Sequence, residues 1–476
     1  MRQTGKNSSS TTRELRSLPA TQETKQTYDL PRVLGASHAT AIVVGTIIGS
    51  GIFLVPHEMM RAVGSSGLVY LAWIVGGLLS LFGAMTYAEL GAMMPYAGGE
   101  YVYIRNAYGD LPAFLYMWTW FSVAKPASIA SVTSGLARTL AIFGVFAWLE
   151  QPVFHGSTAL YWSQLFAIAA TWLITGLNYL GIKKAGDFQL IFTWLKGVLI
   201  VVIAVFCFTS HTGSLANFQT TFTGAQGGFG GFMVAMIAVL WAYDGWNDLT
   251  MVAGEVKRPE RSLPIALIAG LFIVGALYMA TNAAIQYILP ATQIANSPRP
   301  AVAAMAAVSG HAGAVLVSAA MALSIFVTLN GTIMSGARIP FAAARDRLFF
   351  HGMARIHPRF QSPSTSLIIQ ALLSTLLLLV VGRFQQLFEL AIFAEWLFYM
   401  ITATTIFIYR KRQPDAPRPY RVWGYPVLPA LFIAASAILL YFSYAENLRN
   451  SLVGTAIILA GIPLFLGIRR RYSVQR

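Results

Sequence analysis

Two glycine-rich interruptions of strongly apolar segments are the parts of this chain best suited to bind a small molecule. The first reads Gly45-Thr46-Ile47-Ile48-Gly49-Ser50-Gly51-Ile52-Phe53, and the second reads Trp241-Ala242-Tyr243-Asp244-Gly245-Trp246-Asn247. In hydrocarbon, unwound backbone is tolerated only where it is buried in protein or lines a polar cavity. Paired breaks in corresponding helices of two halves are typical of transporters built from inverted repeats, which hold their substrate at the breaks.

The first break predicts a seat for an anion. Gly49 and Gly51 allow a helix to stop and restart. A restarted helix begins with N–H groups that have no partner within it, and these suit a carboxylate. Thr46 and Ser50 add hydroxyl groups. Close packing of small residues is the alternative explanation of the same pattern.

The second break predicts a seat for a cation. Asp244 stands beside Gly245 in an apolar segment, and an intramembrane carboxylate generally faces a polar cavity or a partner. A helix that ends here exposes carbonyl groups, which attract an ammonium group. Two helix ends of opposite polarity fit a zwitterionic α-amino acid. Trp241, Tyr243 and Trp246 either cover the substrate or pack, and we expect Trp241 to be the lid because it precedes the unwound stretch.

Two lysines lie inside apolar segments. Lys196 has two possible roles. Its ammonium group takes the place of a sodium ion and can also bind and release a proton, or it is a structural group bonded to carbonyls of an unwound helix. Its position inside the membrane favours the functional role. Lys125 precedes Pro126 and either stabilises a kink or places charge in a cavity. We expect four further charged residues near helix ends to be solvated: Glu89, Glu100, Glu255 and Arg338. As alternatives, Glu89 and Glu100 are gate or interface residues, Arg338 reaches a carboxylate, and Glu255 takes part in cytoplasmic ion pairs with its basic neighbours.

The composition is that of a polytopic membrane protein. Of 476 residues, 56% are hydrophobic and 11% are charged, against about 25% charged in an average soluble protein. We predict twelve spans, near 36–60, 66–94, 112–147, 159–179, 187–209, 229–253, 262–288, 311–343, 365–382, 386–409, 427–445 and 449–468.

The distribution of basic residues predicts the orientation. The two tails and the connections after even-numbered spans carry 25 of the 33 Lys and Arg residues, and the opposite connections carry 5. Such alternation is the positive-inside pattern, so both termini are expected in the cytoplasm of a protein in the cell membrane. The net charge of +15 is therefore not taken as a sign of nucleic acid binding.

Several chemistries have no motif here. Cys207 is the single cysteine, which excludes an intrachain disulfide and a Cys/His metal cluster. The sequence has no P-loop for ATP and no nucleophile–base pair. We predict neither cofactor nor metal, and no enzymatic activity. The first thirty residues lack the apolar core of a signal peptide.

These motifs resemble the amino acid–polyamine–organocation superfamily, most closely its L-type amino acid transporter branch. The two breaks are similar to the signatures of the first and sixth helices of that family. Segments 87–103 and 329–346 resemble its second- and eighth-helix motifs, and the similarity covers positions about 33 to 470.

The resemblance implies an all-α polytopic membrane protein with the leucine-transporter fold. Twelve transmembrane helices would form a 5+5 inverted repeat plus two C-terminal helices. We therefore expect a disordered cytoplasmic tail over 1–32, one repeat over 33–210, the second repeat over 211–412, and helices 11 and 12 with the C-terminal tail over 413–476.

The resemblance also implies roles for residues. The substrate carboxylate is expected on the amides near Ser50 and Gly51. Lys196 matches a fifth-helix lysine that contacts the first break in sodium-independent members. Trp241 falls where the family places an aromatic gate, and Asn247 at a polar position near the substrate. The amine is expected near the carbonyls of Thr46, Ile47, Trp241 and Tyr243.

Two departures from the family pattern matter. Many animal relatives use a cysteine between the third and fourth spans to join a single-pass glycoprotein. Residues 148–158 contain no cysteine, so we expect no disulfide-linked accessory subunit. Asp244 replaces a small residue of several relatives, which leaves open whether the protein exchanges amino acids or couples their entry to a proton.

We expect a sodium-independent secondary transporter of neutral L-amino acids that works by alternating access, through exchange or facilitated transport. Lys196, Trp241 and Asp244 are the expected coupling or gating residues. The expected substrate-binding residues are Thr46, Ile47, Gly49, Ser50, Gly51, Trp241, Ala242, Tyr243, Asp244, Gly245 and Asn247.

Three alternatives stay open at this point. One is a proton-coupled symporter with Lys196 or Asp244 as the proton site. Another is a non-transporting amino acid sensor, which usually needs a longer tail or a signalling domain. The third is a cationic or polyamine substrate, which requires more cavity carboxylates than Asp244 and is opposed by Lys125 and Lys196.

Overall fold

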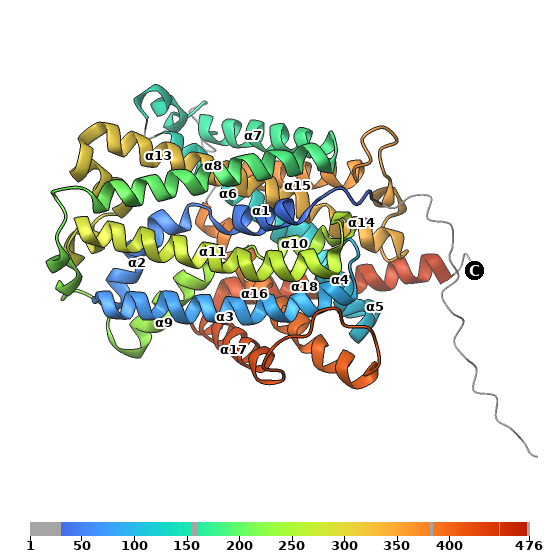
Figure 1. The fold of residues 1–476 in the computed structure, drawn as a ribbon. Coiled ribbons are helices and arrows are strands. Elements are labelled where there is room, and N and C mark those ends of the chain that lie inside the picture. Colours follow the sequence, from blue (N-terminus) through green and yellow to red (C-terminus); the bar gives the residue numbers. More distant parts are fainter. Residues whose placement is uncertain (1–29, 142, 154–159, 381–383, 447, 474–476) are drawn as a thin grey trace, which may run out of the picture.

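The computed structural model describes residues 30–141, 143–153, 160–380, 384–446 and 448–473, and its regular secondary structure in these ranges is helical throughout. The expected tail over 1–32 lies almost entirely outside the described residues. The chain is thus an all-helical protein (Figure 1).

The α-helices follow one another along the chain with short connections between most of them. They are α1 (Ala36–Ile47), α2 (Gly51–Val63), α3 (Ser66–Met93), α4 (Glu100–Tyr108), α5 (Asp110–Thr119), α6 (Lys125–Leu140), α7 (Trp162–Tyr179), α8 (Ile182–Phe208), α9 (Gly228–Ala242), α10 (Asp248–Met251), α11 (Pro259–Ile288), α12 (Ala291–Asn296), α13 (Pro300–Gly336), α14 (Arg338–Arg345), α15 (Ser364–Val380), α16 (Phe384–Arg412), α17 (Val427–Glu446) and α18 (Leu448–Ser473).

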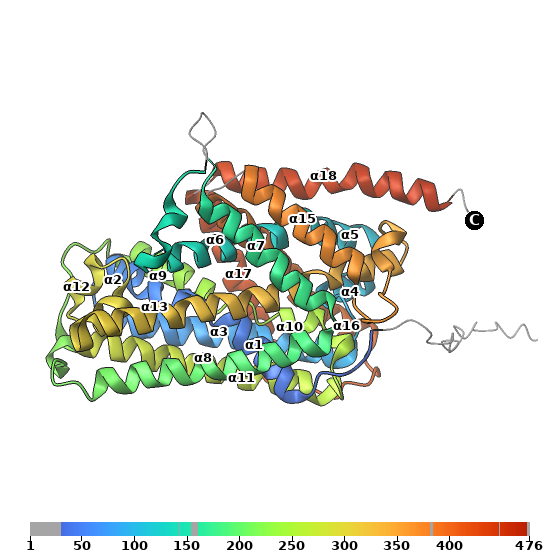
Figure 2. The ribbon, with the colours of Figure 1, turned by 90° about the horizontal axis from the view of Figure 1, so that it is seen from above.

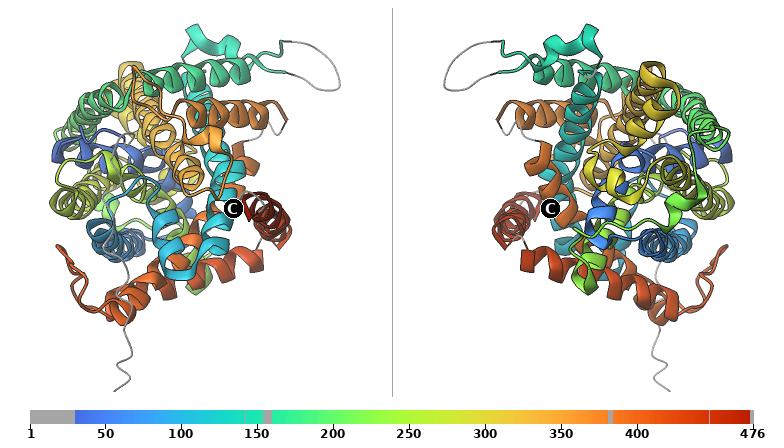
Figure 3. Two further views of the ribbon diagram at one scale, coloured as in Figure 1. Left: turned by 90° about the vertical axis from the view of Figure 1, so that its right-hand side faces the viewer. Right: turned by 90° about the vertical axis from the view of Figure 1, so that its left-hand side faces the viewer.

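The long helices α3, α8, α11 and α13 run side by side along the length of the molecule, and Figure 3 shows the bundle from its two ends. The short pieces α1 and α10 lie inside this bundle, where α1 contacts α8, α11 and α13. Helix α18 lies at one edge (Figure 2) and packs against α5, α16 and α17. The start of α1 and the end of α18 point to the same end of the bundle, which agrees with an even number of crossings.

Length and hydropathy single out several helices as membrane spans. Among the described residues, five helices are long and apolar enough to cross a bilayer, and α1 with α2 forms a sixth candidate span that is bent by 42°. Shorter apolar helices cover Gly228–Ala242, Ser364–Val380 and Val427–Phe442. A polytopic membrane protein is therefore supported, while the number of twelve spans stays a prediction.

The third span ends elsewhere than the sequence predicted, whereas the eighth begins as predicted. The third span was expected to reach residue 147, but α6 ends at Leu140 and a 3-10 helix, η2 (Gly144–Glu150), packs against α6 and α7. An apolar run alone does not distinguish a continuing helix from such a packed turn. The eighth span was expected from residue 311, and α13 is interrupted just before it, where Ser309 and Gly310 have non-helical backbone angles. The predicted start of this span is therefore confirmed, and a shorter helical segment that begins at Pro300 precedes it.

The expectation of solvated charges at the helix ends was wrong, whereas the alternative for Arg338, contact with a carboxylate, is confirmed. Glu255 and Arg338 are fully buried and form a two-pronged ion pair, with Nε–Oε2 and Nη2–Oε1 distances of 2.9 and 3.0 Å. Glu89 is buried and accepts bonds from Arg410 at 3.0 and 2.7 Å. Glu100 is buried as well. Their partners lie far away in the sequence, so local composition could not reveal them.

We predict that the Glu255–Arg338 pair is needed for stability. Arg338→Met should lower the free energy of unfolding by about 3–5 kcal/mol, because it leaves a buried carboxylate without its partner. Denaturation in detergent measures this. The exposed pair Lys183–Asp187, with an Nζ–Oδ2 distance of 3.0 Å, is the control, and Lys183→Met should cost about 1 kcal/mol or less.

A second variant separates loss of the pair from loss of shape. The double change Arg338→Met with Glu255→Leu removes both charges, so it should recover most of the stability lost in the single variant. A double variant as unstable as Arg338→Met would show that packing, and not the unpaired charge, causes the loss.

Candidate functional site

Both predicted helix breaks are confirmed. Helix α1 ends at Ile47, α2 begins at Gly51, and the two axes differ by 42°. Helix α9 ends at Ala242, and a turn leads to the short helix α10, which begins at Asp248. Gly245 in this turn has a φ of +105°, a conformation that residues with a side chain rarely adopt. The glycines thus permit the interruptions, as their positions predicted.

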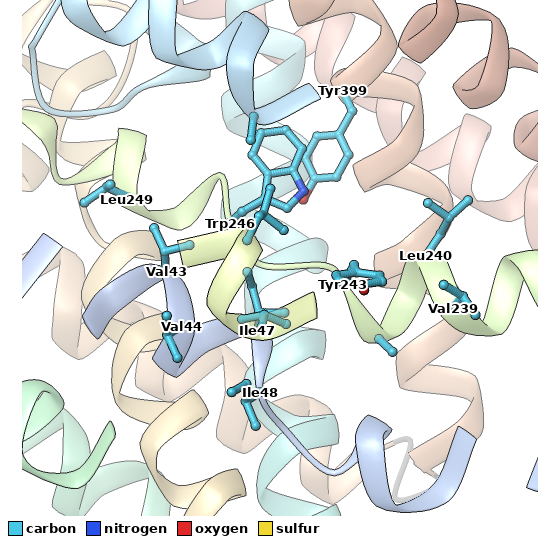
Figure 4. Packing of buried hydrophobic residues seen from close by; sticks show 14 of the residues in the cluster. Val43, Val44, Ile47, Ile48, Val239, Leu240, Tyr243, Trp246, Leu249 and Tyr399 are labelled. Carbon is cyan, nitrogen blue, oxygen red and sulfur yellow. The ribbon is translucent and has the colours of Figure 1, made fainter. Parts of the chain in front are cut away.

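The two breaks touch each other. The Thr46 hydroxyl lies 2.9 Å from the carbonyl oxygen of Gly245. The Tyr278 hydroxyl from α11 lies 3.1 Å from the oxygen of Ile47 and 2.8 Å from that of Ala242, so it joins the last turn of α1 to the last turn of α9. Figure 4 shows the apolar side chains that surround this region, including Ile47 and Ile48.

Lys196 from α8 supplies the first break with positive charge. Its side chain is buried, and its ammonium group donates to the carbonyl oxygens of Gly45 and Ile48, both at 2.7 Å. The contact with the first break that the resemblance implied is confirmed. A side chain at Gly45 would collide with Gln189 and Thr193, so glycine lets α8 come close enough for this contact.

A cavity of about 120 Å³ opens at the breaks. Because about 10–15 Å³ of such space suffices for one water molecule, it can hold a small organic solute. Ten of the eleven predicted binding residues line it: Thr46, Ile47, Gly49, Ser50, Gly51, Trp241, Ala242, Asp244, Gly245 and Asn247.

Three predicted residues lie outside the lining of this cavity. Tyr243 packs against Trp73 and Tyr278, with ring centroids 5.7 and 5.2 Å away. Trp246 packs against Tyr87, with ring centroids 4.8 Å apart. Lys196 bonds to the carbonyl oxygen of Gly45 at the first break but is not part of the cavity lining. Of the three aromatic residues considered as a lid, only Trp241 therefore faces the cavity.

Lys125 lines the cavity and also stands at an irregularity of its helix. It follows a π-helical turn, η1 (Trp120–Ala124), and precedes Pro126, which has no N–H to donate. Its ammonium group lies 2.5 Å from Oδ1 of Asp248, and both side chains are buried. The structure thus supports a charge placed in the cavity, and stabilisation of a kink by Lys125 stays a prediction.

An acidic wall of the cavity was missed by the sequence reasoning. Glu395 from α16 lines the cavity together with Asp244. The Tyr399 hydroxyl lies 2.8 Å from Oδ1 of Asp244 and 2.9 Å from Oδ1 of Asn247. A glutamate inside the apolar tenth span was the available signal, because intramembrane charges are rarely incidental.

Hydroxyl groups complete the polar lining. Ser128 and Ser131 come from α6, and Thr328 and Thr332 come from α13. Within the described part of the chain, no group of three potential metal ligands comes together. The cavity therefore offers helix ends, hydroxyls and charged side chains to a small polar solute.

Comparisons with known proteins agree with this geometry. The sequence pattern of the amino acid permease family matches residues 34–468. The chain is 33% identical over 447 residues to the serine/threonine exchanger SteT of Bacillus subtilis (strain 168), covering 93% of this chain and 98% of SteT. It is 32% identical over 427 residues to the human b(0,+)-type amino acid transporter 1, covering 88% and 83%.

A third relative is named for different substrates. The human cystine/glutamate transporter is 30% identical over 442 residues, which cover 93% of this chain and 86% of the relative. The relatives are transporters and not enzymes. The family pattern spans most of the chain, and the polytopic helical fold is what such a protein requires. This chain therefore belongs to the amino acid permease family of multi-pass membrane transporters.

Proposed function

We propose that the protein is a sodium-independent secondary transporter of neutral L-amino acids, which works by exchange or facilitated transport. The observation that carries the proposal is the cavity between two helix ends of opposite polarity. The amides that begin α2, near Ser50 and Gly51, bind the substrate carboxylate. The carbonyl groups at the ends of α1 and α9 bind its amine.

Hydrogen-bond donors of the protein already occupy part of the carbonyl oxygens at the ends of α1 and α9. The oxygens of Gly45 and Ile48 are taken by Lys196, and Tyr278 lies between those of Ile47 and Ala242. A carbonyl oxygen has two lone pairs, so that of Ala242 can accept a second donor, whereas that of Ile47 already accepts from the N–H of Gly49 at 2.8 Å. The substrate amine then adds a bond at the breaks without breaking the ones that hold them.

Sodium independence is supported by Lys196. Its ammonium group occupies a position between two carbonyl oxygens of an unwound helix, which is the kind of site where a sodium ion would otherwise be coordinated. While the amine is protonated, its positive charge repels a metal cation. Trp241 covers the substrate as the gate, and Asn247 and Asp244 line its far side.

The topology that accompanies this proposal is the one expected from the basic residues. Both termini lie in the cytoplasm, the protein resides in the cell membrane, and residues 33–210 and 211–412 form the two inverted repeats. Helices α17 and α18 belong to the C-terminal pair. The single cysteine, Cys207, is buried in α8, which fits a transporter without a disulfide-linked subunit.

The test is uptake of a radiolabelled neutral amino acid into proteoliposomes. We expect preloaded amino acid to accelerate uptake, because exchange needs substrate on both sides, and we expect no change when sodium is replaced by choline. Uptake into empty vesicles that is accelerated by acid outside would instead establish proton symport. A requirement for sodium would contradict the role given to Lys196.

Proton symport is the second candidate because of the surroundings of Lys196. Among the described residues, its bonded partners are carbonyl oxygens and no carboxylate. A buried ammonium without a counter-charge is a group that can release its proton. Asp244 is the other candidate proton site.

We predict that Lys196→Ala abolishes uptake and leaves the protein folded. The change removes two hydrogen bonds from the first break, so the amides of α2 lose the position they need. Uptake and the thermal midpoint in detergent are the measurements. Lys184→Ala, an exposed position of the same helix, is the control. Normal uptake by Lys196→Ala would remove this residue from the mechanism.

We predict that Gly51→Leu blocks substrate binding. A methyl group at Gly51 would already lie 3.4 Å from Ala242 and 3.5 Å from the ring of Trp241, so a leucine side chain must fill the cavity. The measurement is the thermal stabilisation by substrate, which should vanish. Gly67→Leu is the matched control, since no other atom lies within 4 Å of a side chain added there. Undiminished stabilisation of Gly51→Leu would refute the carboxylate seat.

A further inference from the structure

Glu100 is a buried carboxyl group that the proposed transport mechanism does not use. It is the first residue of α4 and is fully buried. Its hydrogen-bond partners are neutral: the Tyr116 hydroxyl donates to Oε2, and Nδ2 of Asn247 lies 3.4 Å from Oε1. Glu100 takes part in none of the ion pairs between described residues. A carboxylate in such surroundings is costly, because burial disfavours the charged form.

The charged residues around Glu100 have partners of their own. Lys125 is bound to Asp248, Arg338 to Glu255, Arg410 to Glu89, and Arg105, on α4 itself, to Asp110 and Asp346. The other titratable groups near Glu100 are tyrosines, which are uncharged at neutral pH: Tyr87, Tyr103, Tyr116 and Tyr399. Lys125 favours the ionised form of Glu100 only from beyond contact distance.

Glu100 stands between two cavities. Its partner Asn247 lines the cavity at the breaks. Ala97 and Val102, on either side of Glu100 in the chain, line a second cavity of about 930 Å³. Charged side chains also line this second cavity: Arg32, Arg105, Arg345 and Asp346. Helices α4 and α14, which contribute to it, lie toward the end of the bundle at which α18 ends (Figure 1). Water and protons can therefore approach Glu100 from the end proposed to face the cytoplasm.

Hydrogen bonds connect Glu100 to the second break. Asn247, which donates to Glu100, belongs to the turn between α9 and α10. The Tyr399 hydroxyl lies 2.9 Å from Oδ1 of Asn247 and 2.8 Å from Oδ1 of Asp244. A change at Glu100 therefore acts on a residue of the cavity lining through a single hydrogen bond.

The loop before Glu100 is packed against the same part of the chain. The N–H of Gly98 donates to the carbonyl oxygen of Met251 at 2.9 Å. A side chain at Gly99 would lie only 2.6 Å from the Thr250 hydroxyl, so this loop touches the residues of α10 directly. The loop and the Glu100 side chain together hold the second break to α4.

The ionised form of Glu100 holds the break more firmly than the protonated form. A carboxylate accepts stronger hydrogen bonds than a neutral carboxyl group, because its full negative charge attracts the donor. Protonation removes this charge, so the bond from Asn247 weakens. Burial raises the pKa of Glu100 to about 7, although the hydrogen bond from Tyr116 opposes the shift. Both forms are therefore populated near neutral pH.

We propose that Glu100 is a proton-binding residue whose protonation releases the second break, so that acidification speeds transport. The proposal rests on the proposed function, in which the parts of the protein around the breaks move in every cycle. Glu100 acts through Asn247 and is therefore a positioning residue. The proton regulates the movement and does not have to cross the membrane with the substrate, which distinguishes this role from proton symport.

The first experiment measures exchange of a labelled neutral amino acid in proteoliposomes with equal pH on both sides. Between about pH 8.5 and about pH 5.5, the exchange rate of the unmodified protein should rise roughly 5-fold, the effect of losing the charge of one hydrogen-bond acceptor. Glu100→Gln keeps the size and lacks the charge, so it should exchange at the fast rate and lose the step near pH 7. Glu100→Asp should keep a step.

The control is Glu58→Gln, on a side chain that is 65% exposed, which should keep the pH profile of the unmodified protein. A profile of Glu100→Gln that coincides with that of the unmodified protein would overturn the proposal. Absence of neutral amino acid exchange by the unmodified protein at every pH would instead count against the proposed function.

The second experiment needs no transport and follows the thermal midpoint in detergent. Because the folded protein holds the proton of Glu100 to a higher pH than the unfolded chain does, this residue lowers stability as pH rises toward 7. Glutamine does not titrate. The midpoint of Glu100→Gln relative to the unmodified protein should therefore rise by roughly 2–4 °C between about pH 5 and about pH 8. A difference that is constant with pH would show that Glu100 binds no proton in this range.

Discussion

Backbone that is unwound in the middle of a membrane protein must find hydrogen-bond partners within the protein, and this requirement organises the structure. At the first break, Lys196, Ser324 and Thr328 approach the carbonyl oxygens that α1 leaves without partners. At the contact of the two breaks, Tyr278 serves both helix ends. The partners come from α8, α11 and α13, so the long helices hold the breaks open.

The same requirement explains why the site is polarised. Side-chain donors satisfy the carbonyl end of α1, whereas the first amides of α2 have no partner within their helix. The carboxylate of an amino acid can then accept hydrogen bonds from these amides, while the rest of the break is already hydrogen-bonded within the protein. Close approach of the helices is possible because small residues face the contacts, as at Gly45 beside Gln189.

Pairing separates charges that support the fold from charges that face the cavity. Arg338 and Glu255 satisfy each other completely, and Glu89 is held by Arg410. Buried groups of this kind connect helices that are distant in the sequence. Asp244 and Glu395 form no such ion pair among the described residues; both line the cavity, where Glu395 is buried and Asp244 is half-buried. An unpaired buried charge at a cavity is where an incoming ligand has most to contribute.

The sequence alone determined where the helices break, because glycine acts locally. Gly49, Gly51 and Gly245 permit the interruptions whatever surrounds them. It also determined the membrane environment, since the apolar composition leaves no alternative. The end of the third span did not follow, because the packing of η2 decided it.

Only the tertiary structure decided which charged residues meet. Lys125 and Asp248 are 123 residues apart, Arg338 and Glu255 are 83 apart, and Tyr399 and Asp244 are 155 apart. Each pairing depends on the packing of separate helices, and no local pattern specifies it. The acidic wall with Glu395 belongs to the same class. Helix breaks are a property of a few neighbouring residues, whereas the charge of a cavity is a property of the whole bundle.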